Sequence, residues 1–254
     1  MTETKVAKSE PVDWLQHQWV MAGVVASAAR FVPIPFVDDV VRAQCRRFVV
    51  SRTLAASGSS LSTASLKPLY GGSGTLVARS LDAIAKVPLK LLLFPVRKMV
   101  AIATSLHGVP MEIMKTVLLG RTLRRQLSSG QMEPGRAEAM RVALDDAFAR
   151  MDFRALRAAI MDALRGVRTW KASAIKSARR LSSSTSASEA TMPADDGVAM
   201  SAARIEKILE RPETLRLFEE FDRRFDEAYA RALAVPSNAK GATPARVSLP
   251  PRVE

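Results

Sequence analysis

The sequence predicts an all-α protein: a multi-helix bundle with proline-hinged helical hairpins, followed by a C-terminal amphipathic helical arm. Of the 254 residues, 48% are hydrophobic and only 6% are aromatic. Alanine, leucine, valine and arginine dominate, which favours helices over sheets. Apolar residues recur every three or four positions through much of the chain, as they do on one face of a helix. No segment alternates apolar and polar residues for long enough to predict a strand.

Composition divides the chain into segments. We expect a disordered N-terminus over 1–11, a helical domain over 12–181, a Ser-rich linker over 182–197, an amphipathic arm over 198–235 and a disordered tail over 236–254.

Within these segments, helical spacing predicts each element in turn. Helices are expected from Val12 to about Arg30 and from Val37 to about Ala56, and then over 75–85. Residues 87–106 should form either one kinked helix or two short helices. Two more helices are expected over 111–127 and from Pro134 to about Met151. A single long helix should follow from Asp152 to about Leu181, and the arm should contain Ser201–Leu209 and Pro212–Leu233. The Ser/Gly-rich residues 57–74 predict a loop with a broken turn inside it.

The first two helices are joined by a rigid hinge. Pro33 and Pro35 fix φ, remove two backbone donors and disfavour helix in the residues before them. Asp38 and Asp39 then lie in the first turn of the second helix, where carboxylates stabilise free N–H groups. Asp38 also precedes Arg42 by four residues, the spacing of a supporting ion pair.

The hinge sequence, Phe31-Val-Pro-Ile-Pro-Phe-Val-Asp-Asp39, resembles the IPIPF-x-D hairpin of an uncharacterised bacterial helical domain often found beside GTPases and similar to EcsC-like proteins. The resemblance covers about residues 20–56. It implies an all-helical domain that associates with membranes or with an attached GTPase, without catalytic residues. This chain departs from the family by lacking any GTPase motif, and polar residues (Arg42, Gln44, Arg46 and Arg47) replace an apolar run.

Charge is unevenly distributed. The net charge is +13, yet residues 30–180 carry 26 Lys/Arg against 10 Asp/Glu, whereas residues 195–231 carry 7 against 10. A basic body predicts an anionic partner: a lipid surface, an acidic protein or nucleic acid. It also suits a body that binds its own acidic arm.

Two basic segments are candidates for contact with an anionic surface. In the leucine-rich segment 87–106, Lys90, Arg97 and Lys98 surround Leu91–Phe94, as in an interfacial helix with snorkelling cations. The alternative there is a core helix with solvated ends. In the long helix the candidates are Arg165, Arg168, Lys171, Lys176, Arg179 and Arg180, and the alternative is a solvated face.

The arm carries an apolar stripe at helical spacing, formed by Leu215, Phe218, Phe221, Phe225 and Tyr229. Such a stripe must be buried on the body of the same chain, on a partner or on a second copy. We take these residues as candidates for partner binding and self-association.

Catalytic chemistry is not indicated. Cys45, the single cysteine, falls on an apolar stripe, so we expect its side chain to be buried and to pack as a small hydrophobic group. His17 and His107, the only histidines, are expected to be structural. No metal-ligand spacing or nucleotide-binding motif is present, so we expect no cofactor, no metal and no enzymatic activity.

Neither apolar stretch predicts a transmembrane helix. Residues 14–29 are too short, and residues 87–106 contain three cations, whereas a span needs about 20 predominantly apolar residues. The N-terminus lacks a signal-peptide pattern. We therefore expect a cytoplasmic, non-enzymatic protein peripheral to an anionic membrane surface or bound to a membrane-linked partner. The alternatives are a soluble scaffold acting through its aromatic arm and, less favoured, a nucleic-acid-binding protein.

Overall fold

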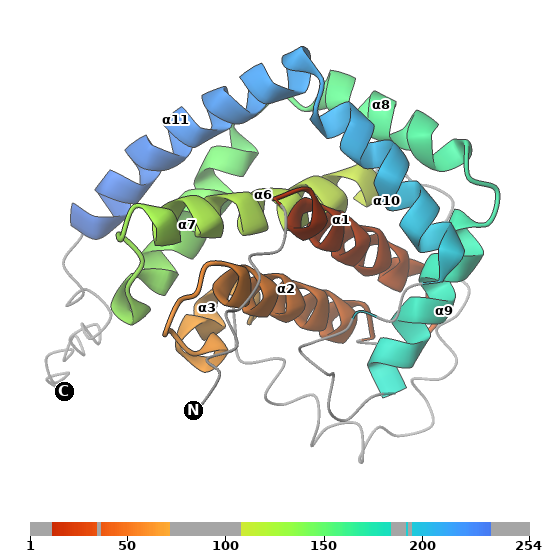
Figure 1. Cartoon of the computed structure of the whole chain (residues 1–254), viewed down its shortest axis with the longest axis horizontal. Coiled ribbons are helices and arrows are strands. Elements are labelled where there is room, and N and C mark those ends of the chain that lie inside the picture. Colours follow the sequence, from red (N-terminus) through yellow and green to blue (C-terminus); the bar gives the residue numbers. More distant parts are fainter. Residues whose placement is uncertain (1–11, 35–36, 72–107, 184–191, 193–194, 235–254) are drawn as a thin grey trace, which may run out of the picture.

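The computed structural model describes residues 12–34, 37–71, 108–183, 192 and 195–234, and within these ranges it contains nine α-helices and no strand (Figure 1). The all-α class is therefore confirmed. No helix within the described ranges is long and apolar enough to cross a bilayer. The helices expected over 75–85 and 87–106 lie outside the described residues, as do residues 1–11 and the tail from 235.

The elements before the gap are α1 (Val12–Ala28), η1 (Ala29–Phe31), α2 (Val37–Ala56), η2 (Thr63–Leu66) and α3 (Lys67–Tyr70), where η marks a 3-10 helix. After it come α6 (Val109–Ser128), η6 (Pro134–Arg136), α7 (Ala137–Ala149), α8 (Arg154–Arg165), α9 (Trp170–Ser183), α10 (Asp196–Leu209) and α11 (Pro212–Ala234). The helices over 12–30, 37–56, 111–127 and 134–151 are thus confirmed within a few residues.

Helix α1 is the centre of the fold. It packs against α2, α6, α9 and α10, and it lies in the middle of the molecule (Figure 1). Every residue from 19 to 29 is buried. A helix that is apolar on all sides needs neighbours all round, which explains why α1 contacts helices from both ends of the chain.

Two glycines allow α1 and α6 to approach closely. A Cβ on Gly23 would lie 2.9 Å from the Cα of Ile113, and a Cβ on Gly120 would lie 2.4 Å from the indole of Trp19. The indole is held in place because its Nε1 donates a hydrogen bond to Thr53 Oγ1 at 3.0 Å. Hydrogen bonding and close packing therefore fix α1, α2 and α6 together.

The prediction of one long helix from Asp152 to Leu181 was wrong. The segment forms two helices, α8 and α9, separated by a turn that begins at Gly166. The backbone N–H of Gly166 still donates to Asp162 at 3.1 Å, but the N–H of Val167 bonds back three residues to Leu164 at 3.0 Å. The predicted loop over 57–74 also contains helical turns, namely η2 and α3.

The C-terminal arm is part of the same core. Helix α10 packs against α1, α8 and α9, and α11 packs against α7. Of the predicted partner-binding stripe, Phe218, Phe221, Phe225 and Tyr229 are buried in this chain and only Leu215 is exposed, at 45%. The first of the three alternatives, burial on the body of the chain, is the observed one. These four aromatic side chains therefore do not present a free binding face.

The predicted linker is bounded by regular structure. Helix α9 continues to Ser183 and α10 starts at Asp196, while 184–191 and 193–194 lie outside the described residues. Asp195 forms ion pairs with Lys176 at 3.0 Å and Arg180 at 3.2 Å. This carboxylate therefore ties the start of α10 to the end of α9.

Candidate functional site

The proline hinge forms an exposed apolar corner of the molecule. Phe31 and Val32 are buried, whereas the side chains of Pro33 and Ile34 face solvent, with Ile34 51% exposed. Pro35 lies outside the described residues. Single exposed apolar residues are common on protein surfaces, and Met200 is exposed to the same extent as Ile34. Ile34 becomes a candidate contact point only together with the cations of the neighbouring helix.

The fold brings the hinge next to the predicted basic helix. The Nζ of Lys171, in the first turn of α9, lies 4.3 Å from the centre of the Phe31 ring. Helix α9 also packs against η1, α1 and α2. A cation over an aromatic face is attracted by the ring quadrupole, so Lys171 connects the buried base of the hinge to a basic surface.

The cations predicted on this helix are all exposed, namely Arg165, Arg168, Lys171, Lys176, Arg179 and Arg180. Arg165 pairs with Asp162 at 3.1 Å. Arg168 and Arg179 form no ion pair with any described residue. Residues 170–183 contain no acidic side chain. We call the surface formed by Pro33, Ile34, Arg168 and α9 the hinge–α9 face. It combines an apolar corner with cations, and the carboxylate of Asp195 lies at its rim.

One acidic residue, Asp195, lies at the rim of this face and pairs with two of its cations, Lys176 and Arg180. Hydrogen bonding from Lys176, with the nearby charge of Arg180, lowers the pKa of Asp195. The carboxylate is therefore ionised throughout the physiological range, and it neutralises part of the charge at the C-terminal end of α9. Of the other cations of α9, Lys171 lies over Phe31 at the base of the hinge, and Arg179 is exposed without an ion pair to any described residue.

The leucine-rich segment with Lys90, Arg97 and Lys98 lies outside the described residues, so its predicted surface role is unaffected by the structure. Just after this segment, the carbonyl oxygen of Gly108 accepts a hydrogen bond from Arg30 Nη2 at 3.3 Å. Arg30 lies in η1, the short 3-10 helix directly before the hinge. The chain thus returns from this segment beside the hinge.

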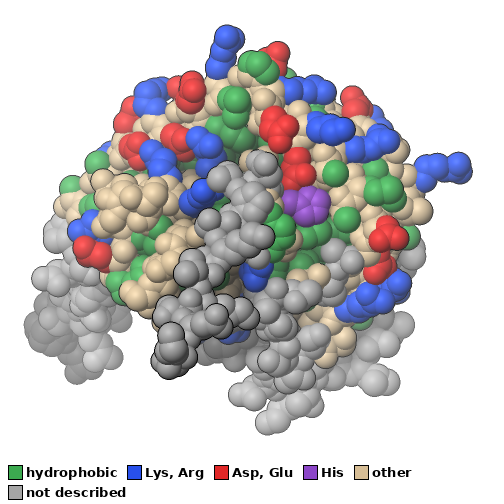
Figure 2. Space-filling view, in the orientation of Figure 1, with side chains coloured by type: hydrophobic (Ala, Val, Ile, Leu, Met, Phe, Trp, Pro, Cys, Tyr) green, Lys and Arg blue, Asp and Glu red, His purple; other side chains and the backbone are tan. Residues whose placement is uncertain are grey.

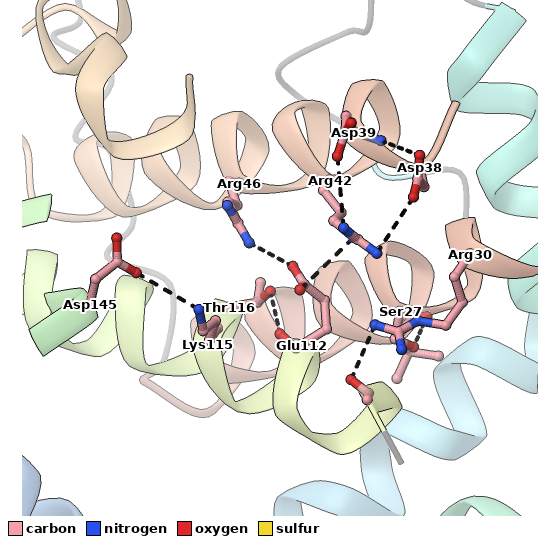
Figure 3. Close-up of polar contacts among 12 residues, drawn as sticks. Ser27, Arg30, Asp38, Asp39, Arg42, Arg46, Glu112, Lys115, Thr116 and Asp145 are labelled. Atoms are coloured by element: carbon pink, nitrogen blue, oxygen red, sulfur yellow. Dashed lines mark hydrogen bonds and ion pairs between the residues drawn. The ribbon is translucent and has the colours of Figure 1, made fainter. Parts of the chain in front are cut away.

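A charged cluster behind the hinge fixes α2 against α6 (Figure 3). Glu112 is only 7% exposed and accepts a hydrogen bond from Arg46 at 2.9 Å, with Arg42 at 3.9 Å. Arg42 also faces Asp38 at 3.9 Å and Asp39 at 3.8 Å. The predicted Asp38–Arg42 pair is therefore confirmed, within a larger network of alternating charges.

Local sequence explains this cluster. Arg42 and Arg46 are one helical turn apart and so lie on the same face of α2. Glu112 lies in the first turn of α6, where a carboxylate favours the free N–H groups. Burial and the charge of Arg42 lower the pKa of Arg30 nearby. Glu112 was not among the predicted site residues, although its position just after Pro110, in the first turn of a helix, indicates a carboxylate with a role there.

Cys45 and His17, the cysteine and the one histidine within the described residues, have structural surroundings, whereas His107 lies outside the described residues. Cys45 is fully buried, and burial raises the pKa of its thiol, which therefore stays protonated. His17 Nδ1 lies 3.0 Å from Glu206 Oε1 and joins α1 to α10. The described residues contain no cluster of three or more His, Cys, Asp or Glu side chains that could hold a metal ion.

Figure 2 shows cations and carboxylates interspersed on the visible face of the molecule, without a large region of one sign. Comparisons with protein-family models, curated proteins and solved structures found no match for this chain. The resemblance of the hinge to the GTPase-associated helical domain therefore stays a prediction, and functional inference depends on the hinge–α9 face itself.

Proposed function

We propose that the protein is a non-enzymatic peripheral protein of anionic membrane surfaces and that the hinge–α9 face is its contact surface. The observation that carries the proposal is the contact of Lys171, on a helix with cations and no acidic residue, with Phe31 at the base of the hinge. The exposed Ile34 follows Phe31 by three residues. Cations flanking an apolar side chain suit the headgroup region, where charge meets phosphate and the apolar group enters the acyl boundary.

The expected affinity of this face is low. Each cation near an anionic leaflet contributes about 1 kcal/mol, so Arg168, Lys171 and Arg179 together supply roughly 3 kcal/mol. Partial burial of Ile34 adds about 1 kcal/mol at ~25 cal/mol per Å². The total of roughly 4 kcal/mol corresponds to a Kd of about 1 mM. Reversible attachment follows, and the cations at 90, 97 and 98 would strengthen it.

Co-sedimentation with liposomes tests this proposal. We expect binding to vesicles with anionic lipid, no binding to neutral phosphatidylcholine vesicles, and release at high salt because surface charges are screened. The decisive variant is Arg168→Glu/Lys171→Glu/Arg179→Glu. A matched variant, Lys207→Glu/Arg211→Glu/Arg216→Glu, makes the same change in net charge around the α10–α11 corner.

Loss of binding in the first variant with retention in the second supports the hinge–α9 face. Equal loss in both variants would mean that net charge alone attracts the protein to the surface. Absence of binding to any vesicle would refute the membrane proposal. Binding that survives high salt would indicate apolar insertion, and Ile34→Asp would then show whether the hinge corner is responsible.

The soluble-scaffold alternative finds less support, because the aromatic stripe is covered by α7 and its neighbours. Nucleic-acid binding also has a weak basis. Single-stranded nucleic acids are usually bound by exposed aromatic residues between cations, whereas Trp170, the one aromatic residue of α9, is only 8% exposed. Nucleic acid could then be bound only through contacts between these cations and the phosphate backbone.

A further inference from the structure

The last turn of α9 carries two serines shortly after two arginines. The sequence there is Arg179-Arg180-Leu181-Ser182-Ser183, and α9 ends at Ser183. The hydroxyl of Ser182 donates a hydrogen bond to the carbonyl oxygen of Arg179 at 2.8 Å, and that of Ser183 donates to Arg180 at 3.0 Å. Both bonds are exposed to solvent and lie within the last turn, so neither bond holds the helix to another element.

The two arginines present guanidinium groups at the surface. Both side chains are exposed, and Arg179 forms no ion pair with any described residue. Arg180 Nη1 lies 3.2 Å from the Asp195 carboxylate, and the side chain of Arg180 is 52% exposed. An exposed pair of this kind contributes little stability, so carboxylates of another protein can replace it with bidentate hydrogen bonds. Residues 179–183 therefore combine serine hydroxyl groups with two exposed cations.

Arginines two and three residues before a serine form a charge pattern by which serine kinases select their substrates. We propose that an arginine-directed serine kinase phosphorylates Ser182. The Ser182 Oγ attacks the γ-phosphorus of a nucleoside triphosphate held by the kinase, the bond from that phosphorus to the β–γ bridging oxygen breaks, and a nucleoside diphosphate leaves. A catalytic carboxylate of the kinase accepts the hydroxyl proton. Arg179 and Arg180 pair with other carboxylates of the kinase during this step.

The kinase acts on molecules in which the last turn of α9 is open. Leu181 lies between the arginines and Ser182 and is only 5% exposed, so the closed turn is held against the body of the protein. Terminal turns open locally at a far lower cost than the whole fold. Leu181→Ala should therefore speed phosphorylation, because the loss of most of a buried side chain favours the open turn. A slower reaction would contradict this route.

Phosphorylation changes the charge of the hinge–α9 face, and its effect on attachment rests on the proposed function of that face. A phosphoserine carries a charge of about −1.5 to −2 at pH 7, and Ser182 lies one helical turn from Arg179. The phosphate therefore offsets about half or more of the charge of Arg168, Lys171 and Arg179. Each unit of charge near an anionic leaflet changes affinity about fivefold. The phosphate should thus weaken attachment about 10–30-fold and act as a switch that releases the protein.

Mass spectrometry of the full chain after incubation with a kinase tests the site. The probe is the catalytic subunit of cyclic-AMP-dependent protein kinase with magnesium ATP, and fragmentation of the product locates the phosphate. We expect Ser182 to be the first residue modified, and Ser182→Ala should lose this phosphate. Arg179→Gln/Arg180→Gln should slow the modification of Ser182 at least about tenfold, since charge-assisted hydrogen bonds to the kinase are lost.

Ser128 is the internal control for the kinase reaction. It is exposed, it ends α6 and follows Arg124 and Arg125, and its hydroxyl donates to the Arg125 carbonyl oxygen at 2.9 Å. The arginines lie three and four residues before it, one residue further away than those before Ser182. Ser128 should gain phosphate at least about tenfold more slowly, because the charge pattern is shifted. Equal rates at both serines, an unchanged rate in the double arginine variant, or no phosphate on Ser182 would overturn the proposal.

Co-sedimentation with anionic liposomes measures the effect of the phosphate, using full chains in which either Ser182 or Ser128 is replaced by phosphoserine during translation. Both chains carry the same added charge, but Ser128 ends a helix of about 30 Å that starts beside the hinge. At about 0.1 M salt the Debye length is about 10 Å, so the distant phosphate is screened.

We expect about 10–30-fold weaker binding for the chain modified at Ser182 and less than about threefold for the chain modified at Ser128. Equal weakening would assign the effect to net charge and overturn the switch. Absence of vesicle binding by the unmodified protein would refute the proposed function together with the switch, whereas the mass spectrum would still decide whether Ser182 is the kinase site.

Discussion

Replacement of Gly120 by alanine should destabilise the protein, because the new methyl group meets the Trp19 indole. The added Cβ would lie 2.4–2.6 Å from three ring atoms, far inside normal contact distance. The indole cannot rotate away without breaking its hydrogen bond to Thr53. Overpacking of this kind costs about 1–3 kcal/mol, whereas alanine gains up to about 1 kcal/mol over glycine inside a helix. We expect a net loss of about 1–2 kcal/mol.

A double-mutant cycle with Trp19→Leu isolates the steric cause. In the leucine background the ring is absent, so Gly120→Ala should become neutral or should stabilise the protein by up to about 1 kcal/mol. The difference between backgrounds, about 2 kcal/mol, is the coupling between the two sites. Urea unfolding followed by circular dichroism gives all four free energies of unfolding.

Gly135→Ala is the control for the glycine effect itself. A Cβ on Gly135 would meet nothing within 4 Å, so this change should be neutral or slightly stabilising. The reasoning is refuted if Gly120→Ala destabilises equally with and without the indole, or if it leaves stability unchanged in the unmodified background.

Three further predictions follow from the core and its charged contacts. Glu112→Gln should lower the free energy of unfolding by about 1–3 kcal/mol, because half-buried arginines lose their carboxylate, and thermal unfolding at low salt measures this loss. The hydrogen bond that His17 Nδ1 donates to the Glu206 carboxylate is the main reason why the pKa of His17 is raised above 6.5. This contribution to stability is therefore complete below pH 6.5 and disappears as pH rises through the raised pKa. His17→Gln should accordingly destabilise the protein more at about pH 5.5 than at about pH 8.5, and an equal loss at both values would contradict this assignment. Phe221→Ala should cost about 3–5 kcal/mol, whereas Leu215→Ala should change stability by less than about 0.5 kcal/mol. Similar urea midpoints for these two variants would show that the stripe is not core.

Much of the fold was predictable because local signals agree with tertiary packing. The periodicity of α2 placed Cys45 on its buried side, and Asp38 with Arg42 formed the expected pair. Pro134 marked the start of the helical region that includes α7. In each case the helix is determined by residues close together in the sequence: a capping residue, a proline or an apolar repeat. Such elements can therefore be predicted from the sequence alone.

The remaining features depend on partners distant in sequence. Apolar positions continue at helical spacing through Leu164 and Val167, so the break at Gly166 is hidden in the periodicity. The guanidinium of Arg204, from α10, occupies the space where a side chain on Gly166 would lie. Likewise, an amphipathic stripe indicates that α11 must be covered but does not identify α7 as its cover.

In the candidate site too, single residues could be predicted from the sequence, whereas their arrangement in space could not. The cations of α9 were predicted individually, but their proximity to the hinge results from the contact of Lys171 with Phe31, across 140 residues of sequence.

The central position of α1 has a consequence for synthesis of the protein. His17 and Glu206, which join α1 to α10, are 189 residues apart. At about 5–20 residues per second, α1 leaves the ribosome roughly 10–40 s before α10 is made. During this interval the apolar surface of α1 is not yet covered by α10, which packs against it in the complete fold. A chain that stops before α10 would keep that surface exposed, which makes premature termination in this region a route to aggregation and to degradation by proteases.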